Sequence, residues 1–493
     1  MPIMDEPTSL DPQIADSNSE KLVAANCYEG LVRIMADGTI GKGVATDWNI
    51  SDDGLTYTFK LRNNSHWAMF SGHKAVLGEN YEDTFDITVK AEDFKFGIER
   101  TLSEQTGDAP LFSAVKSIST PDDFTIVFNL SYADDNFLYA LTNPGAMPCD
   151  EEFFNLTNGK YGLDAKYLLC NGPFHVSKWT EKTSVKLVKN NEYNGESSVS
   201  PSSVTFYINN NDSEVADKMN SVTYDVAFLS SSQFSSIENK KDLNSVAVQN
   251  VTYSFIFNQN DNNYRNKNMR LAFCRSCDTS SLFDSQSDIS KADGIVPPSC
   301  KIGGEDYRNG NAAELLSYDE TLAKKNFNDA LLELGSSSVE TTILCTEQYE
   351  SFVKQMVQKL QKTLGVKFVS TVKVVSESDL EAAVNDGNYS VAFYPFKAKS
   401  SFAGEIIEGF DQNNIFGYES DVLSQKIRNI KNNSGSLEGE RSAVADAENY
   451  LVSEAVIMPV FYENSYFVTS KKTSGIYFYS SADNVCFINA KKS

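Results

Sequence analysis

The chain has 493 residues, of which 41% are hydrophobic and 12% aromatic, so it has ample apolar material and exceeds the size at which one core stops growing. Its formal net charge is −24, from 43 Lys and Arg against 67 Asp and Glu. No basic run is longer than a lysine pair and no apolar run approaches a membrane span, which excludes nucleic-acid binding and a spanning helix. These features predict a globular protein of two or more lobes.

The cysteines are too dilute for a fold built on disulfides, so packed cores must supply the stability. The "CRSC" run at 274–277, followed by Cys300, has no fourth Cys or His nearby, which argues against a zinc site. Free buried thiols and one or two disulfides are both compatible with this pattern. The eight cysteines are Cys27, Cys149, Cys170, Cys274, Cys277, Cys300, Cys345 and Cys486.

Hairpins dominate the pattern of the N-terminal half. In "LTYTFKLR" (55–62) apolar and polar residues alternate after the turn sequence "SDDG", which predicts a β-hairpin. The stretch "VKSISTPDDFTIVFNL" (115–130) predicts a second hairpin with its turn at Pro121 to Asp123. Between them, "KAEDFKFGIERTL" (90–102) has apolar residues at spacings of four and predicts a helix.

The C-terminal half alternates between helices and strands. Residues 350–365 form one apolar helical stripe ended by Gly365, and 366–375 reads as a strand. Ser376 begins a second helix with an N-cap pattern, and 388–396 returns to strand. This β-α-β-α-β order predicts a lobe with a covered, largely parallel sheet.

Two strand-like segments separate these patterns and predict the division into lobes. The first is "VTYSFIFNQN" (251–260), and the second is "IMPVFYENSYFV" (457–468), which precedes an aromatic tail. If the tail rejoins the first lobe, the chain crosses twice, and two crossings make a hinge beside a cleft. We therefore expect lobe I at 1–255 plus 461–493, with a hairpin-rich subdomain at about 46–169, lobe II at 256–460, and hinge crossings near 251–260 and 455–465.

The segments, taken in order, resemble the extracytoplasmic peptide-binding proteins of ABC importers, a family of oligopeptide, dipeptide and nickel receptors. Each segment is a weak signal by itself, but together they cover nearly the whole chain. The matching segments are "PTSLDP" (7–12), "NCYEGLVRIMADGTI" (26–40), "GVATDWNISDDGLTYTFKLRNNSHW" (43–67), "VKAEDFKFGIER" (89–100), "NGPFHVSKW" (171–179), "VKLVKNNEY" (185–193), "MRLAFCRSCD" (269–278), "GIVPP" (294–298), "SYDETLAKKNFNDALLELG" (317–335) and "EAVIMPVFY" (454–462).

The resemblance implies an α/β protein, mixed α+β in its first lobe, with the two-lobed, hinged periplasmic-binding-protein fold of the large peptide-binding type. It implies an extracytoplasmic monomer that closes on a short peptide and delivers it to an ABC permease, with no cofactor, metal or catalytic residue. The abrupt start at "IMDEPTSLDP" adds the expectation that an export signal or lipid anchor precedes this form of the chain.

Candidate ligand-binding residues follow from the resemblance by position, because family members hold peptides as an added strand. They lie in four segments, Asn26 to Glu29, Asn171 to Phe174, Tyr253 to Asn258 and Phe393 to Phe402. In the first segment, an equally good interpretation places Tyr28 in a helix core. The candidates are Asn26, Tyr28, Glu29, Asn171, Phe174, Tyr253, Phe255, Asn258, Tyr394, Phe396, Lys397, Lys399 and Phe402.

The fourth segment departs from the family pattern. Relatives commonly place an Asp for the ligand's ammonium group shortly after an aromatic residue, but here Phe396 is followed by Lys397 and Lys399. A lysine cannot pair with an ammonium group. Lysines that face the cleft predict a ligand bound by a carboxylate, an acidic ligand or a capped peptide, whereas lysines that face solvent carry no such meaning.

A second departure is the long stretch 68–87, which is typical of a tolerated surface insertion and less often of a lid. His66 and His73 lie beside or within it, with Met69 as the one soft neighbour. This set would make a poor nickel site, so no metal is predicted.

Rival functions have weaker support in the sequence. A hydrolase would need a carboxylate pair or an exposed serine, but acidic pairs such as Asp52 and Asp53 are adjacent residues in turn-like contexts, and no "GxSxG" elbow exists. Within the binding class, the alternatives are a receptor for an oligosaccharide or a nickel complex, and a peptide sensor without import. A sugar receptor would favour several exposed Trp for stacking, and this chain has only three Trp in all. A short peptide therefore remains the first choice of ligand.

Overall fold

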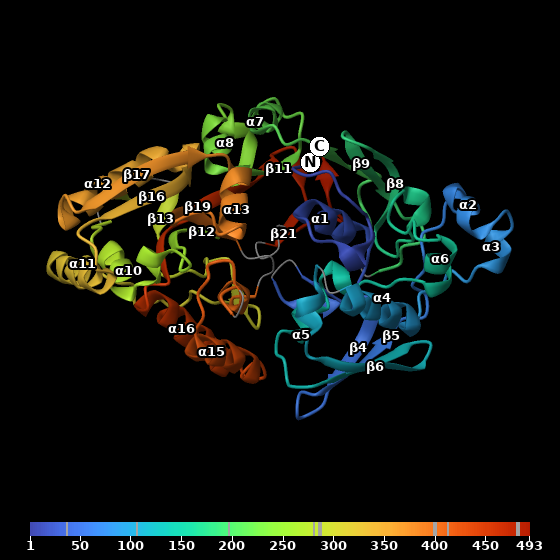
Figure 1. The fold of residues 1–493 in the computed structure, drawn as a ribbon. Coiled ribbons are helices and arrows are strands. Elements are labelled where there is room, and N and C mark those ends of the chain that lie inside the picture. Colours follow the sequence, from blue (N-terminus) through green and yellow to red (C-terminus); the bar gives the residue numbers. More distant parts are fainter. Residues whose placement is uncertain are drawn as a thin grey trace. The chain divides into compact units, whose positions relative to one another are not determined.

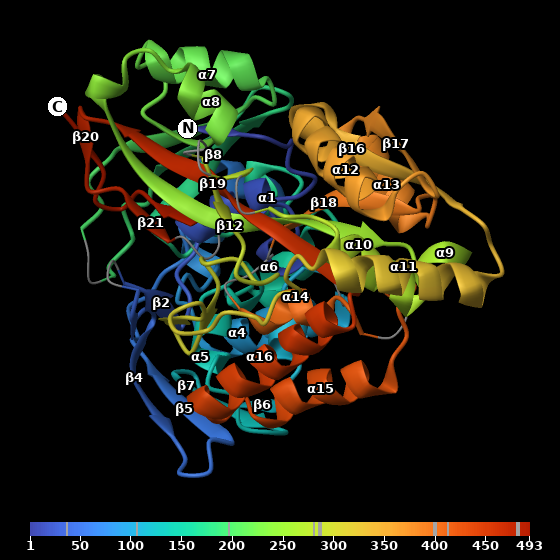
Figure 2. The same ribbon diagram turned by 90° about the vertical axis from the view of Figure 1, so that its left-hand side faces the viewer.

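The computed structural model describes residues 1–35, 38–104, 107–195, 198–279, 282–283, 288–397, 402–411, 414–479 and 484–493 (Figures 1 and 2). The chain divides into two compact units. Unit 1 comprises Met1–Ala247, Ser434–Ser436 and Ser465–Ser493, and unit 2 comprises Val248–Asn433 and Leu437–Asn464. Two long strands, β12 (Leu243–Phe257) and β19 (Ile457–Ser470), contain the boundaries at 247/248 and 464/465.

Unit 1 combines short helices with small sheets. Its helices are α1 (Asn18–Cys27), α2 (Lys74–Leu77), α3 (Tyr81–Thr84), α4 (Ala91–Glu104), α5 (Phe137–Ala140), α6 (Glu151–Leu156), α7 (Asp212–Asn220) and α8 (Ser231–Ser236), with 3-10 turns at Pro12–Ile14, Ser71–His73, Ala109–Phe112, Pro144–Ala146, Ala165–Tyr167 and Lys240–Asp242. Its strands are β1 (Pro2–Ile3), β2 (Val32–Ile34), β3 (Ile40–Lys42), β4 (Ala45–Ile50), β5 (Thr56–Leu61), β6 (Val115–Asp122), β7 (Thr125–Leu130), β8 (Phe174–Thr180), β9 (Ser184–Lys189), β10 (Ser203–Ile208), β11 (Val226–Ser230), β20 (Thr473–Ser474), β21 (Tyr477–Tyr479), β22 (Asn484–Cys486) and β23 (Lys491–Lys492).

The predicted hairpins are confirmed in unit 1. Strands β4, β5, β7 and β6 form a four-stranded antiparallel sheet, in which β4 and β5 make the first hairpin and β6 and β7 the second. The alternating residues Tyr57 and Phe59 of β5 are buried, as are Ile126 and Phe128 of β7, because one face of the sheet packs on the core. Helix α4 confirms the predicted helix, and its Phe94 is fully buried. A second sheet has the order β1-β10-β9-β8.

The N-terminal "LDP" sequence anchors the start of the chain to α4. Asp11 accepts hydrogen bonds from Arg100 of α4 at 2.6 and 3.2 Å, and its side chain also caps the 3-10 turn through the amide of Gln13 at 3.1 Å. Six residues further on, Ser17 and Glu20 make a capping box that begins α1. The polar residues of this segment therefore have structural roles: Asp11 ties the chain to α4, and Ser17 and Glu20 cap the start of α1.

Unit 2 contains longer helices around a mixed sheet. Its helices are α9 (Asn262–Arg265), α10 (Lys267–Arg275), α11 (Glu320–Leu334), α12 (Glu350–Leu364), α13 (Glu377–Asn385), α14 (Gly404–Glu408), α15 (Asp421–Asn432) and α16 (Leu437–Ser453), with a 3-10 turn at Glu347–Tyr349. Its further strands are β13 (Ile289–Lys291), β14 (Lys301–Ile302), β15 (Glu305–Asp306), β16 (Val339–Thr346), β17 (Phe368–Val375) and β18 (Val391–Lys397).

The predicted alternation of strands and helices is confirmed in this unit. Strand β16 pairs in parallel with both β17 and β18, and α12 and α13 make the two connections. Strand β12 lies antiparallel beside β18, and β11 and β13 lie antiparallel beside β19, so the prediction of a largely parallel sheet was wrong: in the described part of the sheet, only β16, β17 and β18 are paired in parallel. Helix α12 buries the stripe that includes Val353, Met356 and Leu360, and Gly365 ends it with a positive φ of 77°. Alternate strand residues enter two cores, one with α10, α11 and α12 and one with α13 to α16, so both faces of the sheet are covered.

The eight cysteines all lie in described residues and are free thiols, of which only Cys486 is not buried. Among the described residues, no helix combines the length and the apolar character needed to cross a membrane.

Candidate ligand-binding site

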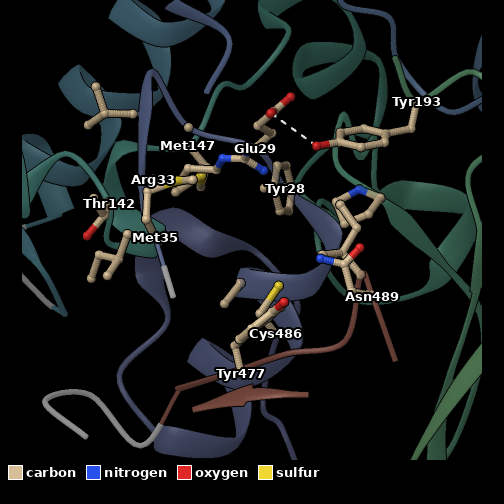
Figure 3. Close-up of a pocket in the computed structure, with 16 residues that line it drawn as sticks. Tyr28, Glu29, Arg33, Met35, Thr142, Met147, Tyr193, Tyr477, Cys486 and Asn489 are labelled. Atoms are coloured by element: carbon tan, nitrogen blue, oxygen red, sulfur yellow. Dashed lines mark hydrogen bonds between the residues drawn. The ribbon is translucent and has the colours of Figure 1, made fainter. Parts of the chain in front are cut away.

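Unit 1 contains a pocket of about 210 Å³ (Figure 3). Segments that are far apart in the sequence form its wall. The lining residues are Ala25 and Tyr28 to Met35 except Leu31, then Thr142, Met147, Pro173, Tyr193, Tyr477, Cys486, Ile488 and Asn489. Two of the predicted site residues, Tyr28 and Glu29, are among them.

The end of α1 positions these two residues. The helix ends at Cys27, and Tyr28 takes an extended conformation that directs the chain out of the helix. Two hydrogen bonds join the backbone of Glu29 to the Asn171 side chain. The backbone N–H of Glu29 donates to Oδ1 of Asn171 at 3.0 Å, and Nδ2 of Asn171 donates to the carbonyl oxygen of Glu29 at 2.8 Å. The amide of Gly172 donates to the carbonyl oxygen of Cys27 at 2.9 Å, and a Cβ at Gly172 would lie 2.6 Å from the backbone of Tyr28. This close approach explains the glycine.

Glu29 is a buried carboxylate with protein partners on the pocket wall. Its side chain forms an ion pair with Arg62. It also accepts a hydrogen bond from the Tyr193 hydroxyl at 3.1 Å (Figure 3). Arg62 also donates to the carbonyl oxygen of Gly43 at 2.6 Å. Burial, followed by the neighbouring charge of Glu29, raises the pKa of Tyr193 above its usual range, so the phenol stays protonated and remains a donor. The charge of Glu29 is therefore balanced within unit 1.

Arg33 and three sulfur-containing side chains also line the pocket. Arg33 comes from β2, and in Figure 3 its guanidinium group lies near Tyr28 and Glu29. Met35, Met147 and Cys486 contribute soft apolar surface. Partial burial raises the pKa of the Cys486 thiol, against the opposing effects of a backbone hydrogen bond at Ile488 and of the Arg33 charge, so the thiol is uncharged at neutral pH.

The other predicted residues of unit 1 lie outside the pocket lining. The Asn26 amide donates to the carbonyl oxygens of Leu22 and Val485 at 2.9 and 2.8 Å, and its side-chain oxygen accepts from the amide of Phe487 at 3.2 Å. Asn26 thus ties α1 to the C-terminal segment. Phe174 begins β8 and is completely buried in the core of unit 1. Asn26 and Asn171 therefore tie distant segments of unit 1 together, whereas Phe174 contributes to its core.

The predicted residues of unit 2 lie mainly on two paired strands. Tyr253 and Phe255 belong to β12, opposite Pro395 and Phe393 of β18. The Tyr253 ring stacks on Phe393 with centroids 5.4 Å apart, and Phe255 is completely buried. Asn258 follows β12 and donates to the carbonyl oxygens of Gly387 and Tyr389 at 2.8 and 2.7 Å.

The remaining candidates lie on β18 and after it. The rings of Tyr394 and Phe396 meet edge to face with centroids 5.5 Å apart, and Phe396 also stacks on Phe410. Lys397 is exposed at the end of β18. Phe402 is partly buried and forms an isolated bridge with Lys301. Lys399 lies outside the described residues.

Sequence reasoning missed several lining residues, above all Arg33, Met35, Met147, Tyr193 and Cys486. Arg33 and Met35 stand in the segment that the family resemblance highlighted, and Tyr193 ends another such segment. No local pattern indicates that they share one pocket, because residues between 25 and 489 must first be brought together by the fold.

His66 and His73, the two histidines beside or within the stretch 68–87, have different neighbours. His66 is bridged to Thr88, whereas His73 packs with its ring centroid 4.2 Å from Phe70, which in turn stacks on His175 at 5.5 Å. His73 is completely buried, and its Nε2 lies 3.1 Å from the carbonyl oxygen of Leu168. Across the ranges that the structure describes, no group of three or more His, Cys, Asp and Glu side chains is arranged to hold a metal ion.

Comparison with known proteins gives consistent matches along the whole chain. The sequence profile of the bacterial extracellular solute-binding proteins, family 5, matches residues 39–416. The dipeptide-binding protein DppE of Bacillus subtilis is 24% identical over 96% of this chain and 88% of its own length. Among solved structures, OppA of Listeria monocytogenes bound to peptide has a TM-score of 0.75 at 20% identity, covering 98% of this chain and 97% of that chain.

A dipeptide-binding protein from Pseudoalteromonas sp. SM9913, solved in complex with Met-Leu, has a TM-score of 0.77 at 18% identity and covers 100% of this chain and 99% of that chain. At these identities the structural likeness establishes the fold, which is the two-lobed periplasmic-binding-protein type that the sequence predicted.

Proposed function

We propose that this chain, which belongs to family 5 of the bacterial extracellular solute-binding proteins, captures short peptides and delivers them to the permease of an ABC importer. The observation that carries the proposal is the match to a dipeptide-binding protein over 96% of the chain. Relatives solved with peptide share the fold. Family members are extracellular solute-binding proteins, and we extend this to a monomeric receptor that binds its ligand without changing it chemically.

The pocket in unit 1 supports this proposal. Its volume of about 210 Å³ is below the range of about 300 to 1,000 Å³ for sites that enclose a whole small molecule, so it fits part of a ligand. Its rigid backing by Asn26 and Asn171 preorganises the wall, which lowers the entropic cost of binding. We propose that Tyr28 and Glu29 contact the ligand directly and that Asn26, Asn171 and Phe174 position them.

For unit 2, we propose that the ligand contacts come from Tyr253, Tyr394, Phe396 and Phe402, with Phe255 and Asn258 as supports. Lys397 and Lys399 are proposed to favour peptides that present a carboxylate or a capped N-terminus. We further propose that β12 and β19 serve as the hinge strands, because each contains a boundary between the units.

Native mass spectrometry of the purified protein, followed by release and sequencing of whatever co-purifies, tests the function. We expect a mixture of short peptides, because closed receptors of this type retain ligand during purification. Calorimetry with synthetic di- to hexapeptides then gives the preferred length, and N-acetylated versions test the proposed role of the lysines. A single sugar or a nickel complex as the bound species, together with no heat of binding for any peptide, would overturn the proposal.

A further inference from the structure

Two buried cysteines of unit 1 face each other where the chain leaves α1. Cys27 is the last residue of α1, and Cys170 directly precedes Asn171, whose side chain binds the backbone of Glu29. Both cysteines are buried in the hydrophobic core of unit 1. Burial, followed by a hydrogen bond with the Cys170 side chain, raises the pKa of Cys27. The two thiols are therefore in direct contact.

Backbone contacts hold the two cysteines in this position. The amide of Gly172 donates to the carbonyl oxygen of Cys27 at 2.9 Å, and the amide of Ala68 donates to the carbonyl oxygen of Cys170 at 2.7 Å. A Cβ at Gly172 would lie 2.7 Å from the carbonyl carbon of Cys27, so the two segments touch without a side chain between them. A disulfide requires Cα atoms about 4.4 to 6.8 Å apart, which segments in such close contact allow.

The spacing of the cysteines along the chain does not reveal this pair. Spacing alone favours Cys274 and Cys277 of the "CRSC" run, but the Cys277 thiol donates to the carbonyl oxygen of Met356 at 3.5 Å. The contact between Cys27 and Cys170 arises only when α1 and the segment before β8 pack together. It is therefore a feature of the tertiary structure.

We propose that Cys27 and Cys170 form a disulfide bond in the extracellular protein, and that this bond fastens the end of α1 to the segment that carries Asn171. Members of the family are extracellular, and oxidising surroundings outside the cytoplasm allow disulfides to form and persist. The proposal concerns a covalent modification and does not depend on the ligand. It can fail while peptide binding holds, and it can hold while peptide binding fails.

The bond forms by thiol–disulfide exchange, in which the oxidant is a second disulfide such as oxidised glutathione. The thiolate of one cysteine attacks that disulfide, breaks its S–S bond and releases one thiol, which leaves a mixed disulfide on the protein. The other cysteine then attacks the mixed disulfide, so the Cys27–Cys170 bond forms and the second thiol leaves. Two electrons pass to the oxidant, and the two cysteine protons end on the released thiols. Because burial hides both thiols in the folded protein, the exchange takes place before the core closes.

Refolding of the full chain under two redox conditions tests the proposal. The reduced, denatured protein is refolded either in a glutathione redox buffer or with the reductant TCEP. We expect the protein from the glutathione buffer to be lighter by two hydrogen atoms, and alkylation in denaturant to miss two of its eight cysteines. Proteolysis without reduction should release one peptide that contains Cys27 linked to one that contains Cys170. Eight reactive thiols, or a bond between other cysteines in place of this one, would overturn the proposal.

Thermal unfolding shows whether the bond fastens unit 1. The Tm of the oxidised wild type should exceed that of the reduced protein by about 5 to 10 °C, because the bond closes a long loop of the unfolded chain. Cys27→Ala should remove this difference between the buffers, whereas Cys300→Ala, at a buried cysteine of unit 2, should keep it. If Cys27→Ala does not fold, the linked peptides of the wild type still decide. Equal Tm values for the wild type in both buffers would contradict the proposed fastening.

Discussion

Each unit contains a buried arginine–glutamate pair, and the two pairs differ in what surrounds them. Arg308 and Glu448 in unit 2 have side-chain exposures of 9% and 1%, and Arg62 and Glu29 in unit 1 have 13% and 4%. Glu448 also accepts from the Tyr307 hydroxyl and the amide of Val296, both at 3.0 Å. Protein donors therefore surround Glu448 on several sides.

Glu29 has a similar ion pair but lies on a pocket wall. The contrast indicates that Glu448, on α16, holds the loop that contains Val296 and Tyr307, whereas Glu29 forms its ion pair on the wall of a pocket, where the proposed function places a ligand. A buried ion pair is by itself weak evidence for function, because structural pairs are built in the same way. The cavity beside Glu29 makes the difference.

Replacing each carboxylate by its amide tests this comparison most strongly. Glu29→Gln and Glu448→Gln both leave a buried arginine without its counter-charge, so we expect each to lower the free energy of unfolding by about 3 to 5 kcal/mol. Urea unfolding followed by circular dichroism measures this loss. Calorimetry on the folded variants should show a changed peptide affinity for Glu29→Gln and an unchanged affinity for Glu448→Gln.

Glu320→Gln is the matched control for these substitutions. Glu320 pairs with Lys324 on the exposed surface of α11, with both side chains about half exposed, so its loss should change stability by less than about 0.5 kcal/mol. A change in affinity of equal size in Glu29→Gln and Glu448→Gln would contradict the distinction between the two pairs.

His73 provides the next largest effect, because it is buried in unit 1 but does not line the pocket. Burial, opposed by its contact with Leu168, lowers its pKa from 6.5 to about 4. The unfolded chain therefore binds more protons than the folded protein between pH 6.5 and 4, and stability falls as the pH drops through this window, by about 3 kcal/mol in total.

As the pH falls from 6.5 to 4, the difference in unfolding free energy between the wild type and His73→Gln should shrink or reverse, because only the wild type carries the buried imidazole. Taking the difference removes the contribution of the carboxylates, which titrate in both proteins. A difference that is constant from pH 7 to pH 4 would show that His73 does not carry the effect.

Tyr193→Phe gives the smallest expected change and refines the description of Glu29. It removes one hydrogen bond to the carboxylate while keeping the ring, so unit 1 should lose about 1 kcal/mol. Peptide affinity should shift in the same direction as in Glu29→Gln, but less. Tyr207→Phe, at an exposed tyrosine of β10, serves as the control and should be neutral in both measurements. A larger effect at Tyr207 than at Tyr193 would be incompatible with this account.

Local patterns were sufficient for many individual elements. The alternation in β5, the apolar stripe of α12 ended by Gly365 and the cap at Ser376 were all predicted from neighbouring residues, and the structure contains each of them. These signals are strong because they depend on backbone geometry with periods of 2 and 3.6 residues. The boundaries between the units were harder to place, since β12 and β19 continue through them without any break in pattern.

The sequence by itself determined the family, the fold type, the two hairpins of unit 1, the alternating helices and strands of unit 2, and two residues of the pocket wall, Tyr28 and Glu29. The tertiary structure decided the rest of the pocket. It joined Glu29 to Arg62 and Tyr193, and it brought Cys486 to the end of α1 through contacts such as that between Asn26 and Val485, which are 459 residues apart. The physical reason is that periodicity reports which face of an element is buried, whereas the partners across that face depend on packing between distant segments.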